Sequence, residues 1–104
     1  MEQYEVILET TAISDLRGIL GYITDVLLEP QITRRMVEVI EEGIMSPDEL
    51  PHRQALLRDE PYRSRGVRWL PIENYTAFYV IDEDTRTVHV LRILYSRRNW
   101  KTLL

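Results

Sequence analysis

Polar and apolar residues alternate over the first segment of the chain. Tyr4, Val6 and Leu8 fall on one side of an extended backbone, and residues 5, 7 and 9 fall on the other. A period of two is typical of a strand with one buried face. The pattern therefore predicts a strand over Tyr4–Glu9.

Two stripes of apolar residues with helical spacing follow this strand. Residues three or four positions apart share one face of a helix, so each stripe predicts an amphipathic helix. The first stripe comprises Ala12, Leu16, Ile19, Leu20, Ile23 and Leu27. The second comprises Ile32, Met36, Val39, Ile40 and Ile44. Pro30 suits the first turn of the second helix, and the short join predicts an antiparallel helical hairpin.

Small and acidic residues add detail to this hairpin. Gly18 and Gly21 predict a close approach between the first helix and its neighbour. Glu38, Glu41 and Glu42 fall largely opposite the apolar stripe of the second helix. We therefore expect them to form a solvated face.

Three further segments in the second half of the chain have the length and composition of strands. Val67–Ile72, Tyr75–Ile81 and Val88–Tyr95 are mostly apolar and are separated by turn residues. The last of them is apolar on both faces apart from His89 and Arg92. Such a run is typical of a central strand that is covered on both sides.

The remaining segments are shorter and more polar. Ser46–Pro51 contains two prolines and predicts a loop. Gln54–Leu57 suits a short strand, and Arg97–Leu103 suits a loop or a short terminal helix.

The order of these elements predicts an α+β fold with two layers. It runs from an N-terminal strand through the helical hairpin to an antiparallel sheet of three to four strands, with a short C-terminal segment. The length of 104 residues fits one domain over 1–104. We expect the hairpin to cover one face of the sheet. The other face should stay partly open and carry the later arginines.

The composition excludes several classes of protein. There are no cysteines, so neither a disulfide framework nor a thiol nucleophile is available. His52 and His89 lie far apart with no clear third ligand, so no metal and no cofactor is expected. No apolar run approaches the roughly 20 residues of a membrane helix, and no signal-peptide pattern opens the chain. We expect a soluble, cytoplasmic protein without a membrane partner.

Charge is distributed unevenly along the chain, whose net charge is −4. Residues 1–52 carry 11 acidic and 3 basic side chains, a net −8, whereas residues 53–104 carry 6 acidic and 10 basic side chains, a net +4. Twelve of the 13 basic residues are arginines. Arginine favours planar, bidentate contacts with phosphate or carboxylate groups.

Two adjacent arginines stand at the exit of the last predicted strand. Arg97 and Arg98 are followed by Trp100, and side chains at strand ends on a rigid sheet are well placed for binding. The pair predicts a phosphate site, and Trp100 is a candidate for stacking on a base. Arg92, inside the strand, predicts an acidic partner within the protein or on a bound one.

Three segments, together with the element order, resemble the RelE/ParE toxins of bacterial type II toxin–antitoxin modules. They are Pro61-Tyr62-Arg63, Asn74-Tyr75 followed by Phe78-Tyr79, and Leu94-Tyr95-Ser96-Arg97-Arg98. The resemblance covers nearly the whole chain and implies the same two-layer fold.

The resemblance implies two alternative activities on this fold. The RelE branch is a metal-independent endoribonuclease that cuts mRNA on the ribosome, and the ParE branch inhibits DNA gyrase. Both are neutralised by a cognate antitoxin whose C-terminal segment wraps the toxin. The first hypothesis is RelE-like mRNA cleavage. The alternatives are ParE-like gyrase inhibition and an inactive toxin-fold protein that only binds its antitoxin.

The RelE chemistry needs a base for the ribose 2′-hydroxyl, cations for the phosphate and an acid for the leaving oxygen. By position, Arg97 matches the family's arginine at the end of the last long strand, and Arg68 lies near its basic pair on the middle strand. Tyr95 is the phenol nearest to Arg97 and is the candidate base. Arg63 and Arg98 are candidates for binding the substrate.

The chain also departs from the nuclease pattern. Thr76 stands where some RelE nucleases carry an arginine, and Leu103 stands near the position of their late tyrosine. The sequence pI of about 5.2 is low for a toxin directed at the ribosome. These departures count against nuclease activity without deciding for gyrase inhibition.

Overall fold

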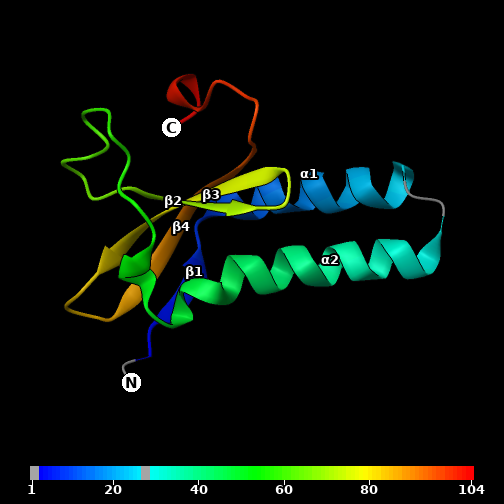
Figure 1. Ribbon diagram of the computed structural model, residues 1–104, viewed down its shortest axis with the longest axis horizontal. Helices are drawn as coiled ribbons and strands as arrows, with labels where there is room; N and C mark the ends of the chain where they lie inside the picture. The colour runs from blue at the N-terminus through cyan, green and yellow to red at the C-terminus, as the bar shows by residue number, and fades with distance from the viewer. Residues whose placement is uncertain (1–2, 27–28) are drawn as a thin grey trace.

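The protein consists of a four-stranded sheet and a helical hairpin, as a computed structural model of residues 3–26 and 29–104 shows (Figure 1). The helices are α1 (Thr10–Val26) and α2 (Pro30–Met45). The strands are β1 (Glu5–Leu8), β2 (Arg68–Ile72), β3 (Tyr75–Asp82) and β4 (Thr87–Tyr95). Three single-turn helices are η1 (Ser46–Asp48), η2 (Pro51–Arg53) and η3 (Trp100–Thr102). The predicted α+β fold and its order of elements are confirmed.

The strands lie in the order β1-β4-β3-β2. Strand β1 pairs with β4 in parallel, and the other two pairs are antiparallel. The position of β4 inside the sheet confirms that Val88–Tyr95 is a central strand. The predicted short strand at Gln54–Leu57 is reduced to a single bridge between Leu56 and Arg68.

The hairpin buries its apolar stripes against one face of the sheet. Ala12, Ile23, Ile40 and Ile44 are each at most 5% exposed. They pack with Tyr79 and the inward residues of the other strands, and Tyr79 has no exposed surface. This face forms the larger of the two cores.

The apolar stripe of α2 is not buried along its whole length. Ile32 and Val39, which the periodicity places in the core, are 53% and 37% exposed. The helices run well past the end of the sheet (Figure 1), so nothing covers part of their length. The predicted Leu27 lies outside the described residues. Glu38, Glu41 and Glu42 are exposed, as expected.

The close approach between layers occurs at Gly43, not at the glycines of α1. A Cβ atom on Gly43 would lie 2.7 Å from the Cγ2 atom of Ile72 in β2, whereas nothing lies within 4 Å of one on Gly18 or Gly21. Glycine at position 43 therefore allows α2 to contact β2. The prediction for Gly18 and Gly21 was wrong because both point into open space.

The second face of the sheet is covered only in part, which agrees with the expectation of a partly open face: Trp69 of β2 is 41% exposed there. Leu57, Val67, Phe78 and Leu94 are buried there in a second core. The partly buried residues that pack against them are Tyr62, Val80, Leu91, Trp100, Leu103 and Leu104. The segment before β2 and the C-terminal segment thus cover part of this face. Arg97 and Arg98 lie in the turn after β4 and not on the face itself.

Helix α1 completes the edge of β4 where β1 ends. Strand β1 pairs with β4 only as far as Val90. Beyond that point, the hydroxyl of Thr11 donates to the carbonyl oxygen of Leu91 (2.8 Å), and the carboxylate of Asp15 accepts from the N–H of Ile93 (3.0 Å). Two side chains one helical turn apart therefore satisfy backbone groups that a longer strand would pair.

Candidate functional site

A cleft of about 530 Å³ lies between α1 and the end of the β3–β4 hairpin. Its lining consists of Ser14, Asp15, Gly18, Ile19, Tyr22, Tyr75, Ile93, Leu94, Tyr95 and Arg98. The cleft exists because α1 crosses the end of β4 and then continues beyond the sheet. We call it the tyrosine cleft, after its three tyrosines.

The tyrosines come from three elements, β3, β4 and α1. Tyr75 and Tyr95 are register partners on β3 and β4, and their rings meet edge to face with centroids 6.0 Å apart. Tyr22 comes from α1 and is 64% exposed. Burial, then the neighbouring Tyr22 and Tyr95, raises the pKa of Tyr75 above its ordinary value. Tyr75 therefore stays a neutral phenol that can donate a hydrogen bond.

Arg97 and Arg98 lie in a turn that is fixed by backbone hydrogen bonds. The N–H of Ser96 donates to the carbonyl oxygen of Asn74 (2.9 Å), and the N–H of Arg98 donates to that of Tyr95 (2.9 Å). Both arginine side chains are exposed. Arg98 lines the tyrosine cleft, and Arg97 does not. Tyr95, the predicted base, is 41% exposed beside them.

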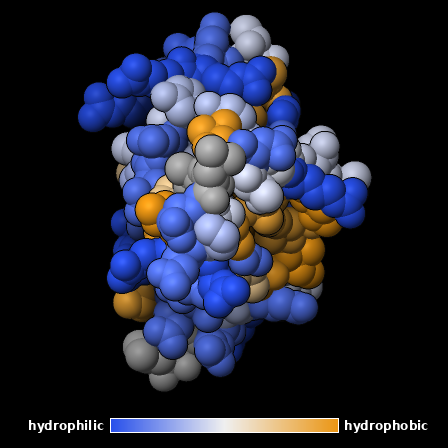
Figure 2. Space-filling model, turned by 90° about the vertical axis from the view of Figure 1, so that its right-hand side faces the viewer, coloured by the Kyte–Doolittle hydropathy of each residue, from blue (hydrophilic) through white to orange (hydrophobic). Residues whose placement is uncertain are grey.

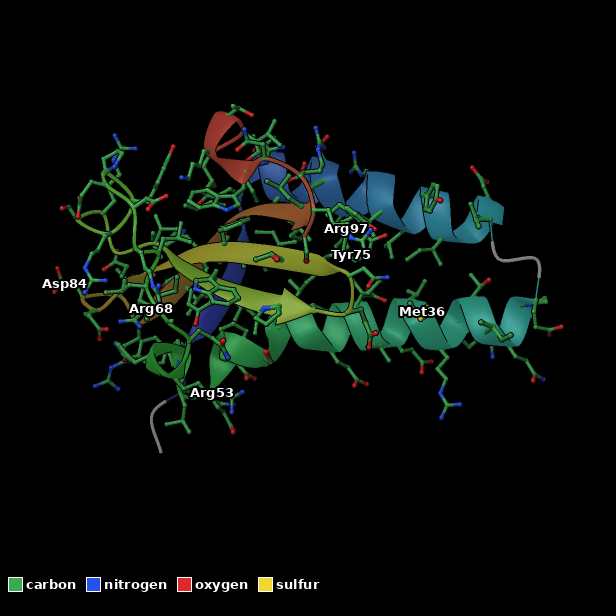
Figure 3. The ribbon with its side chains drawn as sticks, turned by 45° about the horizontal axis from the view of Figure 1, so that its top comes forward. Met36, Arg53, Arg68, Tyr75, Asp84 and Arg97 are labelled. Carbon is green, nitrogen blue, oxygen red and sulfur yellow. The ribbon has the colours of Figure 1, made fainter. Side chains whose placement is uncertain are left out.

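Arg68 lies at the other end of the sheet. Its Nη1 atom donates to the carbonyl oxygens of Gln54 (2.6 Å) and His52 (3.2 Å), so it holds the loop before β2 in place. Arg68 pairs with Tyr79 across β2–β3, four residues along β3 from Tyr75. Figure 3 shows Arg68 and Arg97 well apart. The structure does not bring these two predicted catalytic arginines together.

The two other predicted substrate-binding residues lie near the second core. Trp100 packs against the rings of Tyr62 and Phe78, with centroids 5.4 Å and 5.7 Å away. Arg63 is exposed on the turn before β2, where its N–H donates to the carbonyl oxygen of Asp59 (3.0 Å). Trp100 thus has a packing role in this structure, apart from any contact with a substrate.

A second, smaller cleft of about 450 Å³ opens beside Trp100 on the second face. Its lining consists of Leu57, Trp69, Pro71, Thr76, Phe78, Ser96 and Trp100. Trp69 is 41% exposed at this cleft. The predicted site residues are therefore dispersed. Tyr95 and Arg98 line the tyrosine cleft, and Trp100 lines this cleft. Arg97 lies in the turn after β4, Arg68 at the start of β2 and Arg63 in the loop before it.

The acidic partner predicted for Arg92 lies within the protein. Its Nε and Nη2 atoms donate to the two carboxylate oxygens of Asp15 (2.7 and 2.9 Å), and its Nη1 atom donates to the carbonyl oxygen of Leu103 (2.8 Å). The hydrogen bond with Asp15 raises the pKa of Arg92. Sequence reasoning missed Asp15, because many acidic residues of the first half could have served as the partner.

The histidines also have carboxylate partners. Nε2 of His52 contacts Glu83 in the β3–β4 turn, and Nδ1 of His89 lies 2.9 Å from a carboxylate oxygen of Glu9. Among residues 3–26 and 29–104, no three histidine, cysteine, aspartate or glutamate side chains gather as metal ligands would. In the same part of the chain, no helix has the length and apolar character needed to cross a membrane.

Comparison with known proteins agrees with this architecture. A chain of the RelBE2 toxin–antitoxin complex from Mycobacterium tuberculosis is 28% identical, with a TM-score of 0.61 over 89% of this chain and 98% of that one. A chain of the chromosomal ParDE system from P. aeruginosa is 22% identical, with a TM-score of 0.68 over 91% and 98%, which shows a shared fold.

A search among curated proteins gave no match. The family model for the ParE toxin of the type II toxin–antitoxin system parDE, however, matches residues 6–100. That match spans almost the whole chain, from within β1 through both helices of the hairpin to the end of β4. The chain therefore belongs to the ParE toxin family, within the RelE/ParE group of type II toxins.

Proposed function

We propose that the protein arrests growth by binding a cytoplasmic target, and that this target is DNA gyrase, as the resemblance to the ParE branch implies. The observation that supports this proposal is the separation of Arg68 from Arg97, with Arg68 committed to the carbonyl oxygens of His52 and Gln54. Cleavage of RNA by a ribose hydroxyl needs a base, a cation and an acid around one phosphate. These groups are dispersed here.

The proton-transfer groups that a nuclease needs are also poorly supported. Tyr95, the candidate base, packs edge to face against Tyr75, and Arg68 lies at the other end of the sheet from it. Leu103 replaces the late tyrosine of the nucleases, and its carbonyl oxygen accepts a hydrogen bond from Arg92. A surface that binds without chemistry needs none of these groups.

A cognate antitoxin is the second partner that we propose. The part of the hairpin beyond the sheet exposes apolar side chains of both helices, including Val26, Ile32 and Val39. Figure 2, which views this end of the molecule, shows hydrophobic surface bordered by hydrophilic surface. A partner with an apolar segment would bury such surface. An acidic stretch of the same partner would be drawn to the second half of the chain, whose net charge is +4.

Expression of the chain without an antitoxin tests the proposal. In cells, we expect growth arrest with ribosome-bound mRNA left intact. In a separate assay, the purified protein should inhibit the supercoiling of DNA by purified gyrase holoenzyme. Arg97→Ala should retain most of the growth arrest. Cuts in ribosome-bound mRNA that disappear in Arg97→Ala would contradict gyrase inhibition and favour the nuclease.

RelE-like cleavage remains the second candidate because of one observation. Arg97 is exposed at the end of β4, where a phosphate can reach it. The third candidate, a protein that only binds its antitoxin, predicts neither growth arrest nor inhibition of gyrase. The three candidates therefore give different results in the same expression experiment.

A further inference from the structure

We propose that the tyrosine cleft binds the cellular target, and that the part of the target bound there is an acidic segment of a folded protein. This inference rests on the proposed function, a toxin that acts by binding. Interfaces derive most of their affinity from a few tyrosine, tryptophan and arginine side chains. The cleft gathers three tyrosines and Arg98 around an apolar floor of Ile19 and Ile93.

The tyrosine hydroxyls are free to bind a partner. Within the described part of the chain, no hydrogen bond engages the hydroxyl of Tyr22, Tyr75 or Tyr95. Tyr22 and Tyr95 are 64% and 41% exposed. The half-buried Tyr75 is not among buried side chains that lack a partner, so its hydroxyl also reaches solvent. Tyrosine offers a large contact area at a small loss of conformational entropy.

The charge of the cleft selects an anion. The carboxylate of Asp15 also borders it, but this group is already occupied by Arg92 and by the N–H of Ile93. Among the lining residues, this leaves the guanidinium of Arg98 as the charge without an ion-pair partner. A cation with several phenol donors around it fits a carboxylate.

The surroundings of the cleft favour a protein over a nucleic acid. A nucleic-acid site usually presents a row of cations that follows the phosphates. Here, Arg98 is the one cation among the residues that line the cleft. An acidic protein segment needs only the local cation and the tyrosine rings.

Two substitutions in the cleft and one outside it test the inference. Tyr22→Ala removes an exposed ring, and Arg98→Glu reverses the charge. Arg53→Glu makes the same reversal at η2, far from Arg97 in Figure 3. Each variant is assayed for inhibition of supercoiling by purified gyrase holoenzyme and for growth arrest. Circular dichroism and co-purification with the antitoxin check that each variant is folded.

We expect each cleft variant to lose potency by about tenfold or more, as for a central interface residue, and Arg53→Glu to stay within about twofold. Tyr22→Phe should lie between the wild type and Tyr22→Ala. Folded cleft variants with undiminished potency overturn the inference. So does a variant that loses the antitoxin but still inhibits, because the cleft then serves the antitoxin.

The experiment distinguishes failure of the inference about the tyrosine cleft from failure of the proposed gyrase inhibition. If the wild type arrests growth without inhibiting gyrase, the gyrase assignment fails, and growth arrest by the cleft variants decides the inference. If the arrest comes from cuts in ribosome-bound mRNA that Tyr22→Ala and Arg98→Glu abolish, the occupant is RNA and the inference is overturned. A wild type that neither inhibits nor arrests overturns both.

Discussion

Asp15 and Arg92, 77 residues apart in the sequence, form a two-bond ion pair that joins α1 to β4. Their side chains are only 14% and 22% exposed. The same aspartate accepts a hydrogen bond from the N–H of Ile93, and the same arginine donates one to the carbonyl oxygen of Leu103. One pair thus connects the helix, the end of the sheet and the C-terminal segment.

Removal of either member of this pair should destabilise the fold, and unequally. Asp15→Ala should cost about 3–4 kcal/mol, because it leaves Arg92 without its partner charge and the N–H of Ile93 unpaired. Arg92→Leu should cost about 2 kcal/mol, since Asp15 keeps the backbone N–H. Urea unfolding measures both. Equal losses below about 1 kcal/mol would mean that the pair behaves like a solvated surface bridge.

Glycine-to-alanine substitutions in the two helices should have opposite signs. Gly43→Ala places a methyl group 2.7 Å from Ile72 and should cost about 1–3 kcal/mol through overpacking. Gly21→Ala meets nothing within 4 Å, and the higher helix propensity of alanine should stabilise the protein by about 0.5–1 kcal/mol. Thermal unfolding of the two variants compares them directly. A stabilising Gly43→Ala would refute the close approach of α2 to β2.

Substitution of Arg68 should affect stability and not activity. Arg68→Met removes the donor that the carbonyl oxygens of His52 and Gln54 share, so unfolding should become easier by about 1–3 kcal/mol. Toxicity per folded molecule should be unchanged. The exposed Arg97→Ala serves as the matched control for stability. A stable Arg68→Met variant without toxicity would restore Arg68 as a site residue.

Stability should depend on pH through Glu83. Hydrogen bonds from His52, and then from Tyr4, lower the pKa of this carboxyl group below its ordinary value of 4.5. A lowered folded-state pKa gives stability that is present above about pH 4.5 and is lost as the pH falls through the folded-state value. Glu83→Gln should therefore flatten the acid limb of the stability curve. Urea midpoints measured from about pH 6 down to about pH 3 test this sign.

Periodicity predicted the elements well because it reports burial directly. The strand pattern of Val88–Tyr95 could only suit a strand inside the sheet, and β4 lies there. Periodicity could not predict how far the helices extend beyond the sheet. Ile32 falls on the apolar stripe of α2 whether or not the sheet covers that part of the helix. The exposure of Ile32 depends on the relative lengths of the two layers, which no local pattern contains.

The candidate site was harder to predict because it depends on strand register. A shift of two residues keeps every side chain on its face, so the pattern of Tyr75–Ile81 fits several distances between Arg68 and Arg97. The hydrogen-bonded register sets Arg68 opposite Tyr79 and Tyr95 opposite Tyr75. Arg97 and Arg98 could be paired from the sequence alone because they are adjacent. The proximity of Tyr22 to Tyr75 and Tyr95 could not, because it depends on how α1 packs beside the paired strands.

The early end of β1 has a consequence for the order of synthesis. This strand is synthesised first, yet it pairs with β4, which is synthesised much later. Likewise, the hydroxyl of Thr11 donates to the carbonyl oxygen of Leu91, which is 80 residues further along the chain. Contacts of such separation form late and slowly. On the ribosome, the nascent chain therefore holds an unpaired strand and an unanchored helix until β4 emerges. The folded toxin should therefore form in one late step, after β4 has been synthesised.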